Sequence, residues 1–227
     1  MRKASGSSGT TMAMVLSLQL DSSSRVFDEA ARVLRRSGVI AMPTETFYAL
    51  GASTSDEVAL RRVCAIKGRP QGKPLLALIA DRAQLTALVD EVTSAATTLM
   101  ERFWPGPLTL IFSASSLLPE ALTAGTGSVG VRQPAHAGLA SLLRHVGPLT
   151  GTSANRSGEP PGRTAEEVQT TLGSAVDLIL DGGSTIGGLP STIVDTVGPL
   201  RLLREGPISR QQIEAALSMA GMALGSS

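Results

Sequence analysis

Apolar runs of strand length alternate with segments of helical period along this 227-residue chain, and that alternation most limits how it can fold. Apolar residues recur at helical spacing between Val26 and Leu34, and the run 39–42 (VIAM) after Gly38 has the length of a buried strand. Segments that alternate in this way pack as helices on a sheet, which is the α/β class. Because the connections between the expected strands vary in length, we expect one domain with a mixed sheet.

The remaining elements are predicted from the same patterns. We expect strands at residues 15–20, 74–80, 108–112, 128–132, 177–181, 191–195 and 200–204, and a strand that runs into a polar loop at 148–155. We expect helices at residues 54–67, 81–89, 94–103 and 134–146, one that starts at 164, and a last one at 209–220. Three of them open on capping-box spacing, at Thr54, Thr164 and Ser209, and Gly68 stands where a helix-ending glycine is typical.

Composition excludes several classes of protein. The net charge is only +1 and aromatic residues make up 3%, so any basic site is local and the core is aliphatic. A single cysteine, Cys64, excludes an internal disulfide and a Cys-rich zinc site, and fits a reducing compartment such as the cytoplasm. With no run of about 18 apolar residues, no membrane span is expected. We expect His136 and His145 at the surface or the edge of the core.

Residues 67–75 read KGRPQGKPL and concentrate positive charge on a stiff stretch. Lys67, Arg69 and Lys73 alternate with glycine and proline, which favour loop conformations and exclude a helix across the stretch. An exposed surface turn is one interpretation, and an anion site is the other.

Polar stretches also follow several expected strands, where open α/β sheets place their ligands. They are PTET (43–46), KGRP (67–70), TSAN (152–155) and LLREG (202–206), together with Arg132 at the end of SVGVR. The chain has no P-loop, and its G-x-G-x-x-G match at 125–130 is followed by a strand pattern rather than a helix.

The chemistry of these stretches suits an anion. Arginine and lysine could converge on it, and hydroxyls and an amide could orient it, from Lys67, Arg69, Arg132, Arg204, Thr44, Ser153 and Asn155. With no evident nucleophile and base, phosphoryl or nucleotidyl transfer fits best, because there the protein mainly positions groups and stabilises charge. Surface salt bridges for the cations and a turn for residues 153–155 remain alternatives. From the residues alone, the chain is an anion-binding α/β domain.

Seven stretches in order closely resemble the YrdC-type threonylcarbamoyl-AMP synthase family, in its short, single-domain form. They are PTETFYALG (43–51), KGRPQGKPL (67–75), WPGPLTL (104–110), TAGTGSVGVRQP (123–134), TSANRSGEPP (152–161), PSTIVD (190–195) and LLREGPIS (202–209). The resemblance covers residues 25–215, and it includes the family's paired K-x-R and S-x-N signature.

The resemblance implies a twisted, open, mixed α/β sheet with flanking helices around a positively charged concave cavity. It implies a catalytic domain at 21–220, with 1–20 as a tail and short N-terminal strand and 221–227 as a tail. It implies synthesis of threonylcarbamoyl-adenylate and pyrophosphate from L-threonine, bicarbonate and ATP with Mg²⁺. Partner proteins would then complete the t6A37 modification of tRNA, which this chain would contact weakly or only through those partners.

The resemblance also assigns residues. Lys67, Arg69, Ser153 and Asn155 would act on the ATP phosphates as catalytic and nucleotide-binding residues, and Thr123 and Arg204 would bind the nucleotide. Thr44, Arg132 and Ser191 would form the threonine site, with Arg132 on the carboxylate. Because Mg²⁺ would bridge the phosphates, no protein metal ligands are expected. Lys67 and Arg69 are expected to be exposed in the cavity, so their substitution by alanine should leave the fold intact.

Two residues depart from the family pattern. Ala49 stands where glycine is usual, and Leu78 where longer members often have histidine near threonine. Two other functions stay open: a double-stranded RNA-binding module that uses the same basic cavity, and a carbamoyl-transfer domain like that of hydrogenase maturation proteins. The net charge and the scarcity of aromatic residues for stacking argue against the first. The absence of zinc-finger-like and acylphosphatase-like parts argues against the second.

Overall fold

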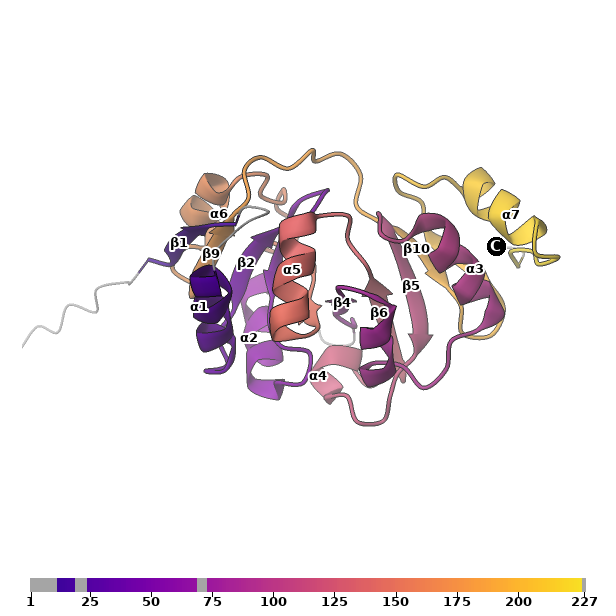
Figure 1. Ribbon diagram of the computed structural model, residues 1–227, viewed down its shortest axis with the longest axis horizontal. Coiled ribbons are helices and arrows are strands. Elements are labelled where there is room, and N and C mark those ends of the chain that lie inside the picture. The colour runs from indigo at the N-terminus through magenta and orange to yellow at the C-terminus, as the bar shows by residue number, and fades with distance from the viewer. Residues whose placement is uncertain (1–11, 19–23, 69–72, 226–227) are drawn as a thin grey trace, which may run out of the picture.

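The computed structural model describes residues 12–18, 24–68 and 73–225, and in this part the strands form two mixed sheets (Figure 1). The first sheet has the order β1 (Met14–Ser17), β9 (Leu178–Asp181), β2 (Ile40–Pro43), β3 (Tyr48–Gly51), β8 (Thr152–Ser153). The second has the order β11 (Arg201–Arg204), β10 (Thr192–Asp195), β5 (Leu108–Ser113), β6 (Ser128–Arg132), β4 (Leu76–Leu78), β7 (Leu149–Thr150). The predicted mixed α/β architecture is confirmed, although the sequence did not indicate two sheets.

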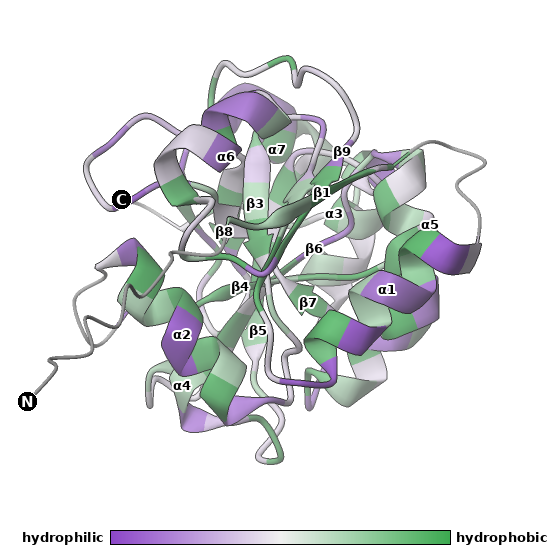
Figure 2. Cartoon of the chain, turned by 90° about the vertical axis from the view of Figure 1, so that its left-hand side faces the viewer, coloured by the Kyte–Doolittle hydropathy of each residue, from purple (hydrophilic) through white to green (hydrophobic). Residues whose placement is uncertain are grey.

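The helices cover both faces of the strands (Figure 2). Helices α1 and α5 pack together on one side, and α2 and α4 on the other, while α3 and α7 pack together at the end formed by the second sheet (Figure 1). Their bounds are α1 Ser24–Leu34, α2 Glu57–Lys67, α3 Ser94–Phe103, α4 Glu120–Thr123, α5 Ala137–Val146, α6 Ala165–Leu172 and α7 Arg210–Ser218, and a 3₁₀ helix spans Arg82–Ala87. No helix in the described ranges has the length and apolarity needed to cross a membrane.

The helix signals in the sequence are mostly confirmed, with one correction. Ser209 forms the predicted capping box with Gln212, and the Thr164 side chain caps α6. Helix α2, however, is capped by Asp56, whose side chain accepts hydrogen bonds from the N–H groups of Val58 and Ala59, so the cap predicted at Thr54 is wrong. Asp56 lies two residues closer to the helix, and its carboxylate suits the positive helix N-terminus.

Two elements were not predicted, the strand β3 and the short helix α4. Strand β3 lies within PTETFYALG, where the polar residues 44–46 precede it and its own four residues, YALG, show no apolar–polar alternation. It is nevertheless fully buried between β2 and β8.

A short segment joins the two sheets. Strand β7 pairs with β4 in the second sheet, and β8, which begins after Gly151, pairs with β3 in the first. The Thr150 hydroxyl donates to the carbonyl of Leu50, and the Thr150 N–H donates to that of Ala52, which ties β7 to the end of β3 as well. Residues 149–153 therefore hold the sheets side by side, with the polar stretch 152–155 at the junction.

The apolar core crosses from one sheet to the other. In the larger cluster, Ala41 and Leu50 of the first sheet pack with Leu108 and Val129 of the second. Cys64 is partly buried against this core, as a packing residue would be. The two histidines lie at its edge, since His136 caps α5 and His145 pairs with Asp28 on α1.

Candidate functional site

A cavity of about 420 Å³ lies between the two sheets. The first sheet contributes Tyr48, Ala49 and Ser153, and the second contributes Leu78, Arg132 and Arg204. The wall combines aliphatic side chains with hydroxyls, two arginines and the carboxylate of Asp195, which pairs with Arg201. This mixture is typical of a small-molecule site, in which apolar contacts supply area and a few polar groups fix orientation.

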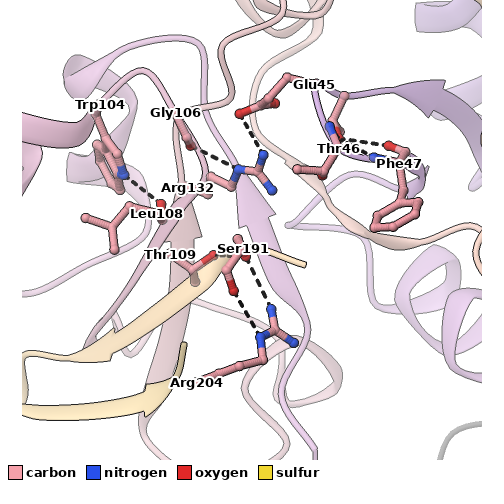
Figure 3. A network of polar contacts seen from close by, with 11 residues as sticks. Glu45, Thr46, Phe47, Trp104, Gly106, Leu108, Thr109, Arg132, Ser191 and Arg204 are labelled. Atoms are coloured by element: carbon pink, nitrogen blue, oxygen red, sulfur yellow. Dashed lines mark hydrogen bonds and ion pairs between the residues drawn. The ribbon is translucent and has the colours of Figure 1, made fainter. Parts of the chain in front are cut away.

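Arg132 is the more deeply buried arginine of the cavity, with 4% of its surface exposed. It is the last residue of β6, and its Nε donates a hydrogen bond of 3.1 Å to the carbonyl of Gly106 (Figure 3). Its Nη2 lies 2.6 Å from Glu45 Oε1. A buried guanidinium that keeps part of its fork toward a cavity is suited to a carboxylate.

Arg204, the last residue of β11, lines the same cavity, and hydrogen bonds to Ser191 orient its side chain (Figure 3). Its Nε donates to the Ser191 carbonyl over 2.9 Å and its Nη2 donates to Ser191 Oγ over 3.3 Å. The Ser191 hydroxyl also shares a 2.9 Å hydrogen bond with Thr109. Burial, followed by repulsion from Arg132, lowers the pKa of Arg204. Two like charges that repel across a cavity favour an anion between them.

Thr44 lies at the end of β2 in a tight turn. Its Oγ1 donates to the carbonyl of Phe47 over 2.8 Å and accepts from the N–H groups of Thr46 and Phe47. Thr44 and Thr46 both line the cavity, so Thr44, Arg132 and Ser191, which were assigned to threonine, and Arg204, which was assigned to the nucleotide, lie around one cavity. Their roles stay predictions.

Lys67 is placed differently from the prediction that it is exposed in the cavity, and that prediction is wrong. Only 5% of it is exposed, and it is not among the residues that line the cavity. Its Nζ donates to the carbonyl of Ser153 over 2.7 Å, to Asn155 Oδ1 over 2.8 Å and to Ser153 Oγ over 3.3 Å. The ammonium is drawn inward because these oxygens replace its water shell, and the C-terminus of α2 favours positive charge.

Ser153 and Asn155 therefore form one unit with Lys67. The Ser153 hydroxyl donates to Asn155 Oδ1 over 2.6 Å, and the Asn155 amide donates to the carbonyls of Arg156 and Glu159. Ser153 faces the cavity, whereas Asn155 lies behind it. Arg69, the other cation of the K-x-R pair, lies outside the described residues.

Thr123 does not join this group. It is the last residue of α4, it is buried, and it is not among the residues that line the cavity. The two departures from the family pattern do lie at the cavity, since Ala49 and Leu78 both line it. Leu78 packs so closely on Gly151 that a Cβ there would lie 2.7 Å from both of its methyl carbons.

Tyr48 anchors the chain that leaves β9. Its hydroxyl donates to the carbonyl of Gly183 over 2.9 Å and lies 3.2 Å from Asp181 Oδ1. Burial first, and the charge of Asp181 second, raise the pKa of Tyr48, so its hydroxyl stays protonated. The residue is therefore suited to positioning rather than to proton abstraction.

The sequence interpretation did not single out Glu45 or Thr109. Glu45 lies within PTET, but nothing in the sequence indicated that its carboxylate meets Arg132. Within the described ranges, no group of three or more His, Cys, Asp or Glu side chains gathers as a metal site.

Comparison with known proteins gives consistent matches. A profile of the Sua5, YciO and YrdC proteins, described as Telomere recombination, matches residues 32–206. The threonylcarbamoyl-AMP synthase of Pyrococcus abyssi is 40% identical over 190 residues, which are 83% of this chain and 56% of that protein. The chain thus spans about half the length of this relative.

Solved structures match as well. The crystal structure of P. abyssi Sua5 complexed with L-threonine has a TM-score of 0.85 and 36% identity, with 94% of this chain and 62% of that chain covered. The crystal structure of E. coli YciO has a TM-score of 0.77 and 30% identity, with 86% and 97% covered. The profile match and the shared fold together show that this chain belongs to the Sua5/YciO/YrdC family.

Proposed function

We propose that the chain is a threonylcarbamoyl-AMP synthase, which converts L-threonine, bicarbonate and ATP into threonylcarbamoyl-adenylate and pyrophosphate. The observation that carries the proposal is the pair of arginines, Arg132 and Arg204, that face one cavity with the Ser191 hydroxyl between them. A similar protein from P. abyssi was crystallised with L-threonine, and curated relatives have this activity in their names.

Threonine would lie at the floor of the cavity. Arg132 would bind its carboxylate, Ser191 would donate or accept a further hydrogen bond, and the turn at Thr44 would close the site. Leu78 would give this site an apolar contact instead of the histidine found in longer relatives. The γ-methyl group of threonine, which serine lacks, would bury apolar surface against Leu78, so we expect Leu78 to favour threonine over serine.

ATP would lie toward the junction of the sheets. The hydroxyl of Ser153 faces the cavity, and Lys67 and Asn155 support it from behind. Arg204 and Arg69 would neutralise the phosphates, and Mg²⁺ would arrive with ATP on its phosphate oxygens. Thr123 lies away from the cavity wall, so it would contact the nucleotide only after a movement of α4.

The reaction needs proximity and charge stabilisation more than a strong nucleophile on the protein. The threonine amine would lose a proton and form a bond to the carbon of CO₂, or to the carbon of bicarbonate with loss of water, which gives a carbamate. A carbamate oxygen would then form a bond to the α-phosphorus while the bond to pyrophosphate breaks. The arginines would stabilise the charge that develops, and orientation of the reactants would supply the rest of the acceleration.

The product would serve t6A37 formation in tRNA through partner proteins. We place this activity in the cytoplasm, which the single cysteine supports.

The test is a synthase assay with ATP, Mg²⁺, L-threonine and ¹⁴C-bicarbonate. We expect pyrophosphate release that requires both threonine and bicarbonate, and a labelled adenylate on rapid chromatography. Arg204→Met should reduce the rate by at least about tenfold, because it removes one charge-assisted contact. Arg61→Met is the control, since Arg61 pairs with Glu57 on the surface of α2 and neither residue lines the cavity. Pyrophosphate release that is independent of threonine would contradict the proposal.

A further inference from the structure

Glu45 presents a buried carboxylate that lacks hydrogen-bond donors. Both of its oxygens are buried, and neither accepts a hydrogen bond in the described part of the chain. Its neighbour Arg132 compensates its charge across 2.6 Å. A buried carboxylate is normally stabilised by hydrogen-bond donors to its oxygens. The Glu45 oxygens lack such donors, so they can accept hydrogen bonds from a ligand.

The contact with Arg132 is close but poorly aligned. Arg132 Nη2 approaches Glu45 within ion-pair distance, yet it has no partner that meets hydrogen-bond geometry. The aligned bond of this guanidinium is the one from Nε to the Gly106 carbonyl. Gly106 therefore orients Arg132, and Glu45 is held mainly by charge, which leaves its oxygens available to another donor.

The other titratable group nearby supplies little charge. Burial lowers the pKa of His136, although Glu45 opposes that shift, and His136 Nδ1 accepts the N–H of Leu139. His136 is therefore neutral at pH 7, and Arg132 stays the cation that faces Glu45.

We infer that Glu45 recognises the α-ammonium of the amino-acid substrate, an inference that rests on the proposed function. Arg132 and Glu45 set a cation beside an anion, and a zwitterionic amino acid carries the complementary pair. Its carboxylate binds Arg132, and its ammonium brings three donors to the two oxygens that lack them. Glu45 is not itself among the residues that line the cavity, but its ion-pair partner Arg132 and its neighbours Thr44 and Thr46 are. An ammonium that enters beside Arg132 would therefore meet Glu45 just behind the cavity wall.

Two simpler roles for Glu45 make different predictions. If Glu45 only held Arg132 in place, its loss would weaken every carboxylate ligand alike. If Glu45 only competed for Arg132, its loss would tighten every carboxylate ligand alike. Ammonium recognition alone makes the effect depend on the amino group of the ligand.

The experiment compares L-threonine with 3-hydroxybutyrate, which is threonine without its amino group. Binding of each to the wild type and to Glu45→Gln is measured by calorimetry with MgATP and without bicarbonate. We expect Glu45→Gln to weaken threonine by at least about tenfold, the scale of one charge-assisted hydrogen bond, while 3-hydroxybutyrate is unchanged or tighter. Glu57→Gln is the control, because Glu57 forms a comparable ion pair with Arg61 on the surface of α2. It should leave both affinities within about twofold.

Equal weakening of both ligands, or equal tightening, would overturn the inference and leave the proposed function standing. A folded wild type that binds neither ligand would overturn the threonine site itself. Melting curves establish that Glu45→Gln is folded. Should it not fold, the wild type still decides, because equal affinity for threonine and 3-hydroxybutyrate would also overturn the inference.

Discussion

Lys67→Met should destabilise the protein, because the structure makes Lys67 an internal support. Its ammonium is buried and donates to the Ser153 carbonyl and to Asn155 Oδ1 over 2.7 and 2.8 Å. Methionine keeps most of the length and apolar volume of lysine but removes these bonds. An exposed phosphate-binding lysine would instead be replaced with almost no change in stability.

The magnitude follows from what each bond contributes. A hydrogen bond from a charged donor contributes about 1.5–3 kcal/mol, so two short ones contribute about 3–6 kcal/mol. Both acceptors keep a second donor, since the Asn155 N–H donates to the Ser153 carbonyl and the Ser153 hydroxyl donates to Asn155, so neither becomes an orphan. Removal of a desolvated charge returns a few kcal/mol. The net loss is about 2 kcal/mol, or a fall in Tm of about 4–8 °C for a chain of this size.

Thermal and urea unfolding by circular dichroism measure this loss. Lys73→Met is the matched control, since Lys73 lies in the same KGRPQGKPL stretch and is exposed, and it should change stability by no more than about 0.5 kcal/mol. A double-mutant cycle with Asn155→Ala should give a coupling of about 1 kcal/mol or more. If Lys67→Met and Lys73→Met unfolded at the same temperature as the wild type, Lys67 would not have the buried role described here.

Three further predictions concern stability. Asp56→Ala should cost about 1 kcal/mol in urea unfolding, because it removes the cap of α2, and no change would mean that another group caps the helix. Gly151→Ala should cost about 1–3 kcal/mol, since the added methyl overlaps Leu78, and Gly151→Ala combined with Leu78→Ala should recover part of the loss if the overlap is the cause. Burial lowers the pKa of His136 below its ordinary value of 6.5, so the unfolded chain binds the proton more readily. Stability should therefore be complete above about pH 6.5 and fall as the pH drops toward the lower folded pKa. His136→Asn should flatten this dependence in melting curves between pH 7.5 and 5, and an unchanged slope would exclude His136 as its source.

Local signals in the sequence were sufficient for most elements of the fold. The expected helices at 94–103 and 209–220 lie close to α3 and α7, because their caps and apolar periods agree. Strand β3 was not predicted because it is only four residues long and lies in a motif that begins with polar residues. The division into two sheets could not be predicted, because it depends on which strands pair with each other, and the periodicity of the sequence does not contain that information.

The candidate site divides in the same way. Thr44, Arg132 and Arg204 could be singled out because each follows or ends an expected strand, whereas Ser191 came from the family resemblance, and all four line one cavity. Their partners could not be predicted. Glu45 and Arg132 form an ion pair although they lie 87 residues apart in the sequence. Such long-range contacts decide whether a cation faces a ligand or an internal oxygen.

The Ser153 side of the site is built on the two shortest strands, β7 and β8, and the buried Lys67 stabilises it. Strands β7 and β8 have two residues each, too few to be stable by backbone pairing alone. The register Ala49↔Ser153 sets the Ser153 hydroxyl at the cavity, and a slip of one residue would turn it to the other face. Lys67 opposes such a slip, because its Nζ binds the carbonyl and hydroxyl of Ser153 while its own carbonyl accepts the N–H of Ser157. The contribution of Lys67 to stability and its contribution to the site are therefore the same set of bonds.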